Sequence, residues 1–120
     1  MRFLCLIYMP ADLDDSLPSG EGDRLIADHF AYDEGLKRKG TMIWSDALEA
    51  PDTAIVIRAR GSALSITDGP FVETKEHLAG FYVIEADDMA GATEIARHIP
   101  SVQYGAIEIR PIRLLTLPGT

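Results

Sequence analysis

The chain has 120 residues, of which 47% are hydrophobic and 25% are charged, as is typical of one globular domain with a single core. Its formal net charge of −8 argues against nucleic-acid binding, because no basic stripe is available to neutralise phosphates. The single cysteine excludes an intramolecular disulfide, and no Cys/His cluster has the spacing of a zinc site. We expect one domain over residues 1–120, cytoplasmic, with neither a signal peptide nor a membrane span.

Residues 1–9 form an apolar segment that predicts a strand. Apolar side chains occupy both of its alternating sides, with Phe3, Cys5 and Ile7 on one and Leu4, Leu6 and Tyr8 on the other. Such a strand is central and covered on both faces. We expect this chain's helices on one face and a partner subunit on the other, with Cys5 as a small core residue and not a nucleophile.

Residues 10–22 are acidic and rich in Pro and Gly, which predicts a solvated loop and not a calcium site. A helical pattern follows over residues 23–39, and Gly40 is a natural C-cap for it. At about 100° per residue, His29 and Asp33 fall in the middle of the apolar arc of this helix, one turn apart on the same side.

A titratable pair inside an apolar helix face leaves two interpretations open. In the first, His29 is a core histidine bonded to Asp33 or to the backbone. In the second, His29 is a general acid–base, oriented by the Asp33 carboxylate, which also raises its basicity. Helical spacing alone does not choose between them.

Strands are predicted over residues 41–48, 53–60 and 62–67, from their β-branched and alternating composition. Arg58 and Arg60 lie two residues apart and therefore share a strand face. Two guanidinium groups on one face either clamp a carboxylate or phosphate or pair with nearby acidic side chains.

The most distinctive segment begins at Asp68-Gly69-Pro70, a sequence that predicts a turn. Several ionisable residues follow between two apolar anchors, and this many charges must lie at a surface or cleft. The anchors are Phe71 and Leu78, and the ionisable residues are Glu73, Lys75, Glu76 and His77. A strand over residues 80–86, a helix capped by Asp87 or Asp88 and ending near His98, and a strand over residues 102–110 complete the prediction.

The motif Asp68-Gly69-Pro70-Phe71, followed by Glu73-x-Lys75-Glu76 and Gly80-Phe81, resembles the signature of the DGPF-domain proteins, a branch of the YCII-related family. Residues 1–8 and 105–112 are similar to that family as well. The resemblance implies an α+β fold of the ferredoxin-like split βαβ type, with an antiparallel sheet and helices on one face. It also implies a homodimer through sheet faces (a dimeric α/β barrel) and an association with extracytoplasmic-function sigma factors.

Two main functions remain open. In the first, a small-molecule enzyme transfers protons in a cleft beside the Asp-Gly-Pro-Phe loop, with His29 as acid or base, Asp33 orienting it and Asp68 as a second carboxylate. YCII-type relatives are similar in carrying a His with an Asp as their suspected active pair. The candidate ligand-binding residues are Arg58, Phe71, Glu73 and Lys75. No Gly-rich phosphate loop is present, and we expect neither a cofactor nor a metal.

In the second function, the chain is a non-catalytic ligand-binding or protein-interaction module linked to sigma-factor regulation. A dimeric scaffold without a ligand is a third possibility.

Overall fold

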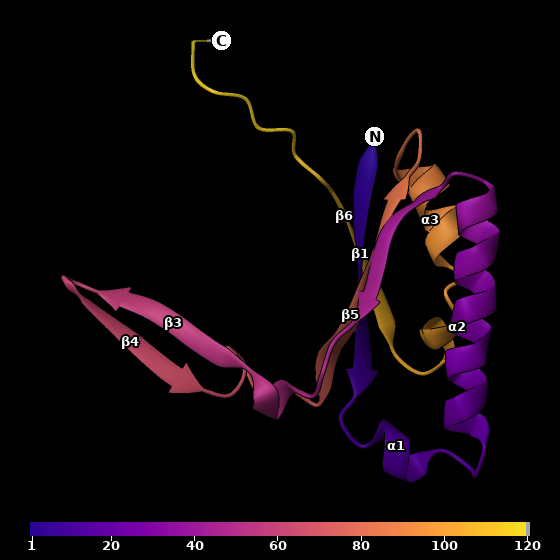
Figure 1. Ribbon diagram of the computed structural model, residues 1–120, viewed down its shortest axis with the longest axis horizontal. Coiled ribbons are helices and arrows are strands. Elements are labelled where there is room, and N and C mark those ends of the chain that lie inside the picture. The colour runs from indigo at the N-terminus through magenta and orange to yellow at the C-terminus, as the bar shows by residue number, and fades with distance from the viewer. Residues whose placement is uncertain (120) are drawn as a thin grey trace.

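The computed structural model describes residues 1–119 and shows a four-stranded sheet, helices packed beside it and a separate hairpin (Figure 1). The main sheet contains β1 (Arg2–Pro10), β2 (Met42–Ala47), β5 (Glu76–Glu85) and β6 (Ala106–Pro111). The helices are α1 (Leu13–Ser16), α2 (Glu21–Arg38) and α3 (Met89–Ala96), with 3₁₀ turns η1 (Pro51–Thr53) and η2 (Pro100–Gln103). The hairpin consists of β3 (Ile55–Arg60) and β4 (Ala63–Asp68). Within the described residues, no helix is both long enough and apolar enough to cross a membrane.

The order of strands across the main sheet is β2-β5-β1-β6, and each neighbouring pair is antiparallel. With α2 between β1 and β2 and α3 between β5 and β6, this is the split βαβ arrangement of ferredoxin-like domains. The predicted α+β fold class is therefore confirmed. Strand β1 lies between two other strands, which agrees with the apolar residues on both of its sides.

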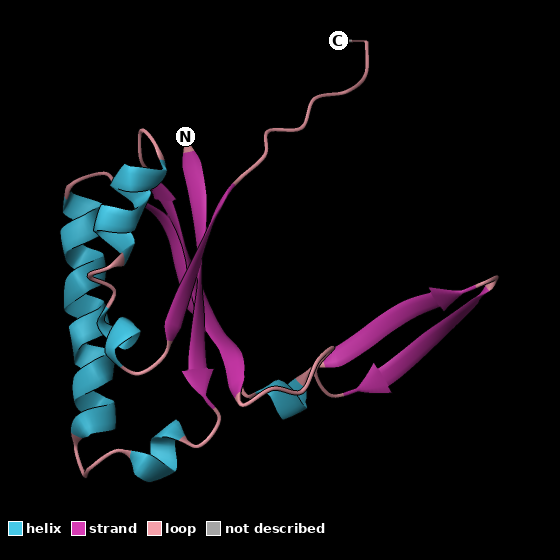
Figure 2. Ribbon diagram, turned by 180° about the vertical axis from the view of Figure 1, so that it is seen from behind, coloured by secondary structure: helices cyan, strands magenta, loops and turns pink. Residues whose placement is uncertain are grey.

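Helices α2 and α3 cover the same face of the sheet, and the core lies between them and the strands (Figure 2). The largest fully buried side chains are Tyr82, Phe3, Ile84, Ile99 and Cys5. Burial raises the pKa of the Cys5 thiol to about 11, so this residue is a core side chain, as predicted.

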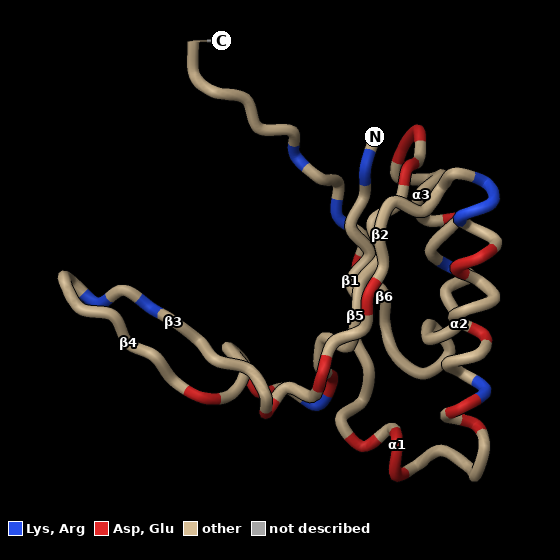
Figure 3. The backbone as a smooth tube through the Cα atoms, viewed as in Figure 1, with Lys and Arg blue, Asp and Glu red and all other residues tan. Residues whose placement is uncertain are grey.

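Both helices carry end groups that suit their dipoles. Acidic residues occupy the first turn of α2 and basic residues its last turn, and Figure 3 shows the basic cluster where the helix ends. The carboxylate of Asp88 accepts a hydrogen bond from the backbone N–H of Gly91 at 2.8 Å, which confirms the predicted N-cap of α3.

Several boundaries differ from the sequence prediction, and the differences at three segments are the largest. The segment at residues 10–22, which was predicted as a loop, contains the short helix α1. Strand β5 begins at Glu76, inside the charged segment that was expected to precede the strand. The predicted strand over residues 102–110 starts too early, because Pro100 opens the turn η2 and β6 begins only at Ala106.

Strands β3 and β4 pair with each other in a sheet of their own, which we call the arm (residues 55–68). The arm projects from one end of the main sheet, on the side opposite the helices (Figures 1 and 2). Gly69 has φ +97° and its N–H bonds the carbonyl of Ala54 at 2.8 Å, so the predicted Asp-Gly-Pro turn closes the base of the arm.

The sheet face opposite the helices is apolar at its centre, and we call it the open face. Its register places Leu4 beside Val83 and Leu6 beside Phe81. Trp44 lies edge-on to Phe81, with 5.7 Å between ring centroids, and is 59% exposed. The extended C-terminal segment also leaves the body on this side (Figure 1).

Candidate active site

A cavity of about 410 Å³ lies between α2 and the end of the sheet where β2 finishes and β5 begins. Its walls are mostly apolar, with polar side chains converging from α2, β2, β5 and η2. The lining residues are Ile7, Met9, Ile26, His29, Phe30, Asp33, Ser45, Asp46, Ala47, Ala79, Gly80, Tyr82 and Ser101. A cavity of this size, with a few convergent polar groups, suits a small organic molecule.

His29 and Asp33 both line this cavity because residues four apart share one side of a helix. Tyr82 comes from the facing strand β5, where strand alternation directs it toward α2. Its hydroxyl donates a hydrogen bond to Oδ1 of Asp33 and lies 2.9 Å from Nδ1 of His29. The two helix residues therefore meet through a tyrosine and not through a direct bond.

This geometry determines where the protons lie. A phenol has one hydrogen, and Tyr82 gives it to the Asp33 carboxylate. The contact with His29 then requires Nδ1–H of the imidazole to donate to the phenolic oxygen. In neutral His29 this assigns the lone pair to Nε2, which leaves that nitrogen able to accept a proton.

The environment opposes charge on both rings. Burial lowers the pKa of His29 and outweighs the opposite influence of the Asp33 and Asp28 carboxylates. The Asp33 carboxylate acts on the His29 pKa in the expected upward direction, but desolvation is the larger effect and the net shift is downward. Burial, reinforced by the hydrogen bond to Asp33, raises the pKa of Tyr82 strongly. At neutral pH the site thus holds a neutral imidazole, with its hydrogen on Nδ1, beside a protonated phenol.

Ser101 adds a polar group that no protein atom satisfies. Its side chain is only 2% exposed, it lines the cavity, and its hydroxyl has no hydrogen-bond partner within the described part of the chain. Leaving a buried hydroxyl unpaired costs about 1–3 kcal/mol. The hydroxyl oxygen is itself buried, so Ser101 contributes to the wall of the cavity without presenting its hydroxyl there.

The other residues predicted for the site lie elsewhere. Asp68 ends β4 at the base of the arm, and it is not among the residues that line the cavity. The guanidinium of Arg58 lies 4.4 Å from the ring centre of Phe71, which is a cation–π contact at the arm. Glu73 and Lys75 are exposed in the segment between the arm and β5.

Tyr82 and Ser101 were missed by the sequence analysis. Tyr82 stands in the apolar run of β5, where a tyrosine looks like an ordinary core residue. Tyr82 could have been identified from its strand face. That face of β5 is directed at the helix that carries His29 and Asp33. Ser101 follows Pro100 at a turn, and nothing in that context marks it as buried.

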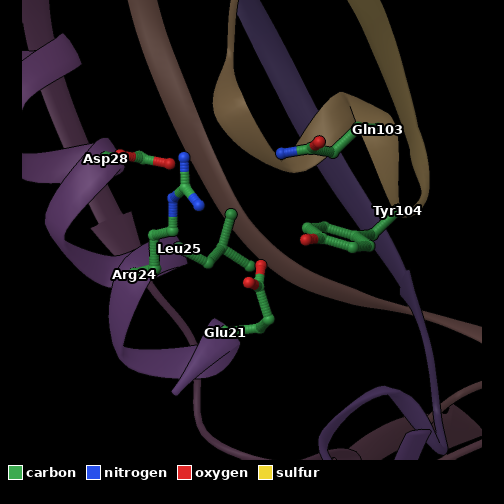
Figure 4. A pocket seen from close by; sticks show the side chains of 6 residues that line it. All are labelled: Glu21, Arg24, Leu25, Asp28, Gln103 and Tyr104. Carbon is green, nitrogen blue, oxygen red and sulfur yellow. The ribbon is translucent and has the colours of Figure 1, made fainter. Parts of the chain in front are cut away.

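A second, smaller pocket of about 190 Å³ lies at the start of α2. Its walls are polar and of mixed charge (Figure 4), formed by Glu21, Arg24, Leu25, Asp28, Gln103 and Tyr104. Figure 4 shows the Arg24 side chain extending toward Asp28, so the charges in this pocket face one another. Within residues 1–119, no group of three or more His, Cys, Asp or Glu side chains is placed to hold a metal ion.

The comparison with protein families matches residues 1–116 to the YCII-related domain. The chain belongs to the YCII-related family. A relative of this YCII-related domain is an uncharacterized protein from Rhizobium meliloti (strain 1021), which is 28% identical over 116 residues. The alignment covers 95% of this chain and 94% of the relative.

The fold of this YCII-related domain is also found in a solved enzyme structure. That protein is the 5-chloro-2-hydroxyhydroquinone dehydrochlorinase TftG from Burkholderia phenoliruptrix AC1100, in complex with 2,5-dihydroxybenzoquinone. The TM-score is 0.50 and the identity 17%, and the match covers 94% of each chain. At this identity the likeness establishes the fold.

Proposed function

We propose that this YCII-related domain is an enzyme that transfers protons to and from a small hydroxylated ring compound. His29 is the base that accepts the proton at Nε2, Tyr82 holds the imidazole in the tautomer that leaves Nε2 free, and Asp33 holds the Tyr82 hydroxyl in place. The observation that carries this proposal is the Tyr82 hydroxyl in contact with both His29 and Asp33 at one wall of the cavity.

The protonation states suit this role. A base must be able to accept a proton at the working pH, and the lowered pKa of His29 keeps its imidazole neutral there. The raised pKa of Tyr82 keeps its hydroxyl protonated and therefore bonded to Asp33 while it contacts Nδ1 of His29. When His29 gains a proton it becomes positively charged. The negative charge of the Asp33 carboxylate, which bonds the same Tyr82 hydroxyl, offsets part of that positive charge. A positioned acid–base group of this kind contributes about 10²–10⁴-fold to a rate.

The cavity suggests the substrate class. Phe30, Ile26 and Met9 offer apolar surface for a ring, while Nε2 of His29 offers an acceptor for a ring hydroxyl. The fold neighbour TftG is a dehydrochlorinase of a hydroxylated hydroquinone, and loss of HCl needs a base to take the proton as chloride departs. This makes hydroxylated hydroquinones and quinones the first compounds to test.

We also propose that two copies pack through their open faces to form a homodimer. Leu4, Leu6, Phe81 and Val83 lie at the centre of this face and are only half-buried within one copy. Trp44 lies beside them with more than half its surface exposed. Contiguous apolar surface of this kind usually marks an interface.

The test of the enzyme proposal is turnover of a panel of hydroquinones, with chloride release followed for 5-chloro-2-hydroxyhydroquinone and absorbance spectra for the rest. We expect activity that falls at least about 100-fold in His29→Gln and Tyr82→Phe. His98→Gln, which removes an exposed histidine paired with Glu94, is the control and should retain activity. Turnover that survives both cavity substitutions would contradict the proposal.

The alternative, a ligand-binding or interaction module, makes a different prediction for the same proteins. Such a module would bind members of the panel without converting them. Removal of the imidazole in His29→Gln would then change affinity only slightly, because no proton transfer depends on it.

A further inference from the structure

We propose that the cavity holds its ligand through hydrogen-bond acceptors, Nε2 of His29 and Oγ of Ser45, and therefore selects neutral rings that carry hydroxyl donors. Quinones offer acceptors where the cavity also offers acceptors, and aromatic carboxylates bring a negative charge, so both classes are disfavoured. This inference deepens the proposed function and rests on it, because it names the substrate class of the same site.

Ser45 reaches the cavity because β2 contains a β-bulge. The register of β2 on β5 shifts between Met42 and Trp44, so Ile43 has no partner on β5. The extra residue moves the alternation of the strand by one position. Ser45 therefore lies directly opposite Tyr82, on the side of the sheet that faces α2, and lines the cavity. Without the bulge, the large ring of Trp44 would take that side.

The hydrogens of the polar residues at this wall are already used within the protein. Tyr82 donates its hydroxyl hydrogen to Asp33, and the contact with His29 uses Nδ1–H. Burial is the largest influence on the Tyr82 pKa and raises it, whereas a side-chain hydrogen bond with Ser45 lowers it. A hydrogen bond lowers the pKa of a phenol when it is donated to the phenolic oxygen, because it then favours the phenolate. Ser45 therefore gives its hydrogen to Tyr82 and keeps its lone pairs for a ligand.

The other side chains of the lining add no donor. The hydroxyl oxygen of Ser101 is buried, and Asp33 and Asp46 contribute carboxylates, which only accept. Within residues 1–119, no Lys, Arg, Asn, Gln or Trp side chain lines this cavity, and the remaining lining residues are apolar. The polar side-chain atoms that a ligand meets are therefore acceptors, in a surrounding of negative charge.

Both proposed acceptors are accessible from the cavity. His29 and Ser45 are half-buried, whereas Ser101 is only 2% exposed. Nε2 of His29 has no hydrogen-bond partner in the described chain and is not one of its buried unpaired atoms. A ring with two hydroxyl groups can donate one hydrogen to each acceptor. A quinone has only oxygen lone pairs to offer in those places, and a carboxylate is repelled by Asp33.

The first test uses the wild-type protein and calorimetric titration without oxygen. The probes are catechol and hydroquinone, each beside its dimethyl ether, which keeps the ring and both oxygens but lacks the donors. We expect at least one of the two dihydroxybenzenes to bind about tenfold or more tightly than its ether, because the ether cannot donate to either acceptor. In the same way, 2,5-dimethylhydroquinone should bind more tightly than 2,5-dimethylbenzoquinone, and catechol more tightly than 3,4-dihydroxybenzoate.

The second test examines Ser45 itself. Ser45→Ala should raise the Kd of the dihydroxybenzene about tenfold and change that of its ether by less than about twofold, because the ether does not use the acceptor. Ser45→Thr keeps a hydroxyl group on a strand that suits β-branched residues, and it should restore most of the affinity. Ser62→Ala removes an exposed hydroxyl at the tip of the arm and is the control, so both Kd values should stay unchanged.

Two results would overturn the inference. Ethers and a quinone that bind as tightly as their hydroxylated partners would show that the cavity does not select donors. Ser45→Ala protein that binds the dihydroxybenzene like the wild type would show that Oγ of Ser45 is not the second acceptor.

Failure of this inference can be told from failure of the proposed function. If either result appears while His29→Gln loses turnover of the hydroquinone panel, this inference fails and the enzyme proposal stands. Selective binding of donors without turnover of any compound supports this inference and contradicts the enzyme proposal. Wild-type protein that binds none of these rings contradicts both.

Discussion

The phenolic oxygen of Tyr82 lies 2.9 Å from Nδ1 of His29 and also donates its hydrogen to Asp33, so one residue of β5 joins two residues of α2. The rings of His29 and Tyr82 are nearly parallel, with 24° between their planes. This arrangement holds the imidazole in one orientation and one tautomer. The acid–base character proposed for the site depends on this contact and on the burial around it.

Removing the Tyr82 hydroxyl should therefore reduce turnover strongly and the free energy of unfolding only moderately. Tyr82→Phe leaves the half-buried Asp33 carboxylate without this donor, and we expect a loss of about 1–3 kcal/mol in unfolding free energy and at least about 100-fold in turnover. Urea denaturation and steady-state kinetics measure the two effects.

Tyr32→Phe is the matched control for that substitution. The Tyr32 ring packs edge-on against Tyr82, but its hydroxyl donates to the Ile95 carbonyl at 2.6 Å and not to Asp33. Its removal should cost about 1 kcal/mol of stability and leave turnover within a factor of two. Equal losses of turnover in the two variants would show that the Tyr82 hydroxyl has no special role.

The buried imidazole should make stability depend on pH in one direction. The folded-state pKa of His29 lies below the ordinary value of 6.5, so the unfolded state binds more protons just below that pH. The His29 contribution to unfolding free energy is therefore full above about pH 6.5 and decreases as the pH falls toward the folded-state pKa. His29→Gln should flatten this part of the curve, measured by denaturation between pH 5 and 8. A curve that His29→Gln leaves unchanged would contradict the burial of this ring.

Much of the fold could be read from the sequence because local patterns determine it. The two-sided apolar pattern of residues 1–9 identified a central strand, and Asp88 identified the start of α3. Helical periodicity placed His29 and Asp33 on one side of α2, since that relation lies within a single element.

The contacts between elements could not be read in the same way. Tyr82 reaches His29 only because β5 pairs with β1 in one register while α2 packs above it, and neither relation is written in the β5 sequence. Residues 55–68 have the composition of ordinary strands, so their separation from the main sheet as an arm was not visible. Ser101 is buried by tertiary packing and not by its local context.

Cys5 should be unreactive while the protein is folded. Its pKa is raised to about 11 by burial, so at pH 8 it is both inaccessible and protonated. Iodoacetamide should label Cys5 in the folded protein more slowly than in denaturant, by a factor on the order of 10³ or more, because the thiol reacts only in molecules that have unfolded around it. Labelling at comparable rates in both conditions would contradict the buried position of this thiol.

Two glycine substitutions should have opposite effects on stability. A Cβ at Gly105 would lie 1.9 Å from the carbonyl oxygen of Tyr8, so Gly105→Ala must displace backbone and should cost about 3 kcal/mol or more. A Cβ at Gly35 in α2 would meet nothing within 4 Å, and Gly35→Ala should stabilise the helix by about 0.5–1 kcal/mol. Chemical denaturation of both variants measures these differences, and similar effects at the two positions would contradict the close approach at Gly105.

The most direct test of the acid–base site is a ¹⁵N NMR titration of the three imidazoles, with His29 assigned by comparison with His29→Gln. We predict that at pH 7 His29 is neutral and carries its proton on Nδ1, that its pKa lies below that of an ordinary histidine, and that Tyr82→Phe disturbs this tautomer. A His29 ring protonated on Nε2 when neutral, or titrating above the ordinary value of 6.5, would contradict the account.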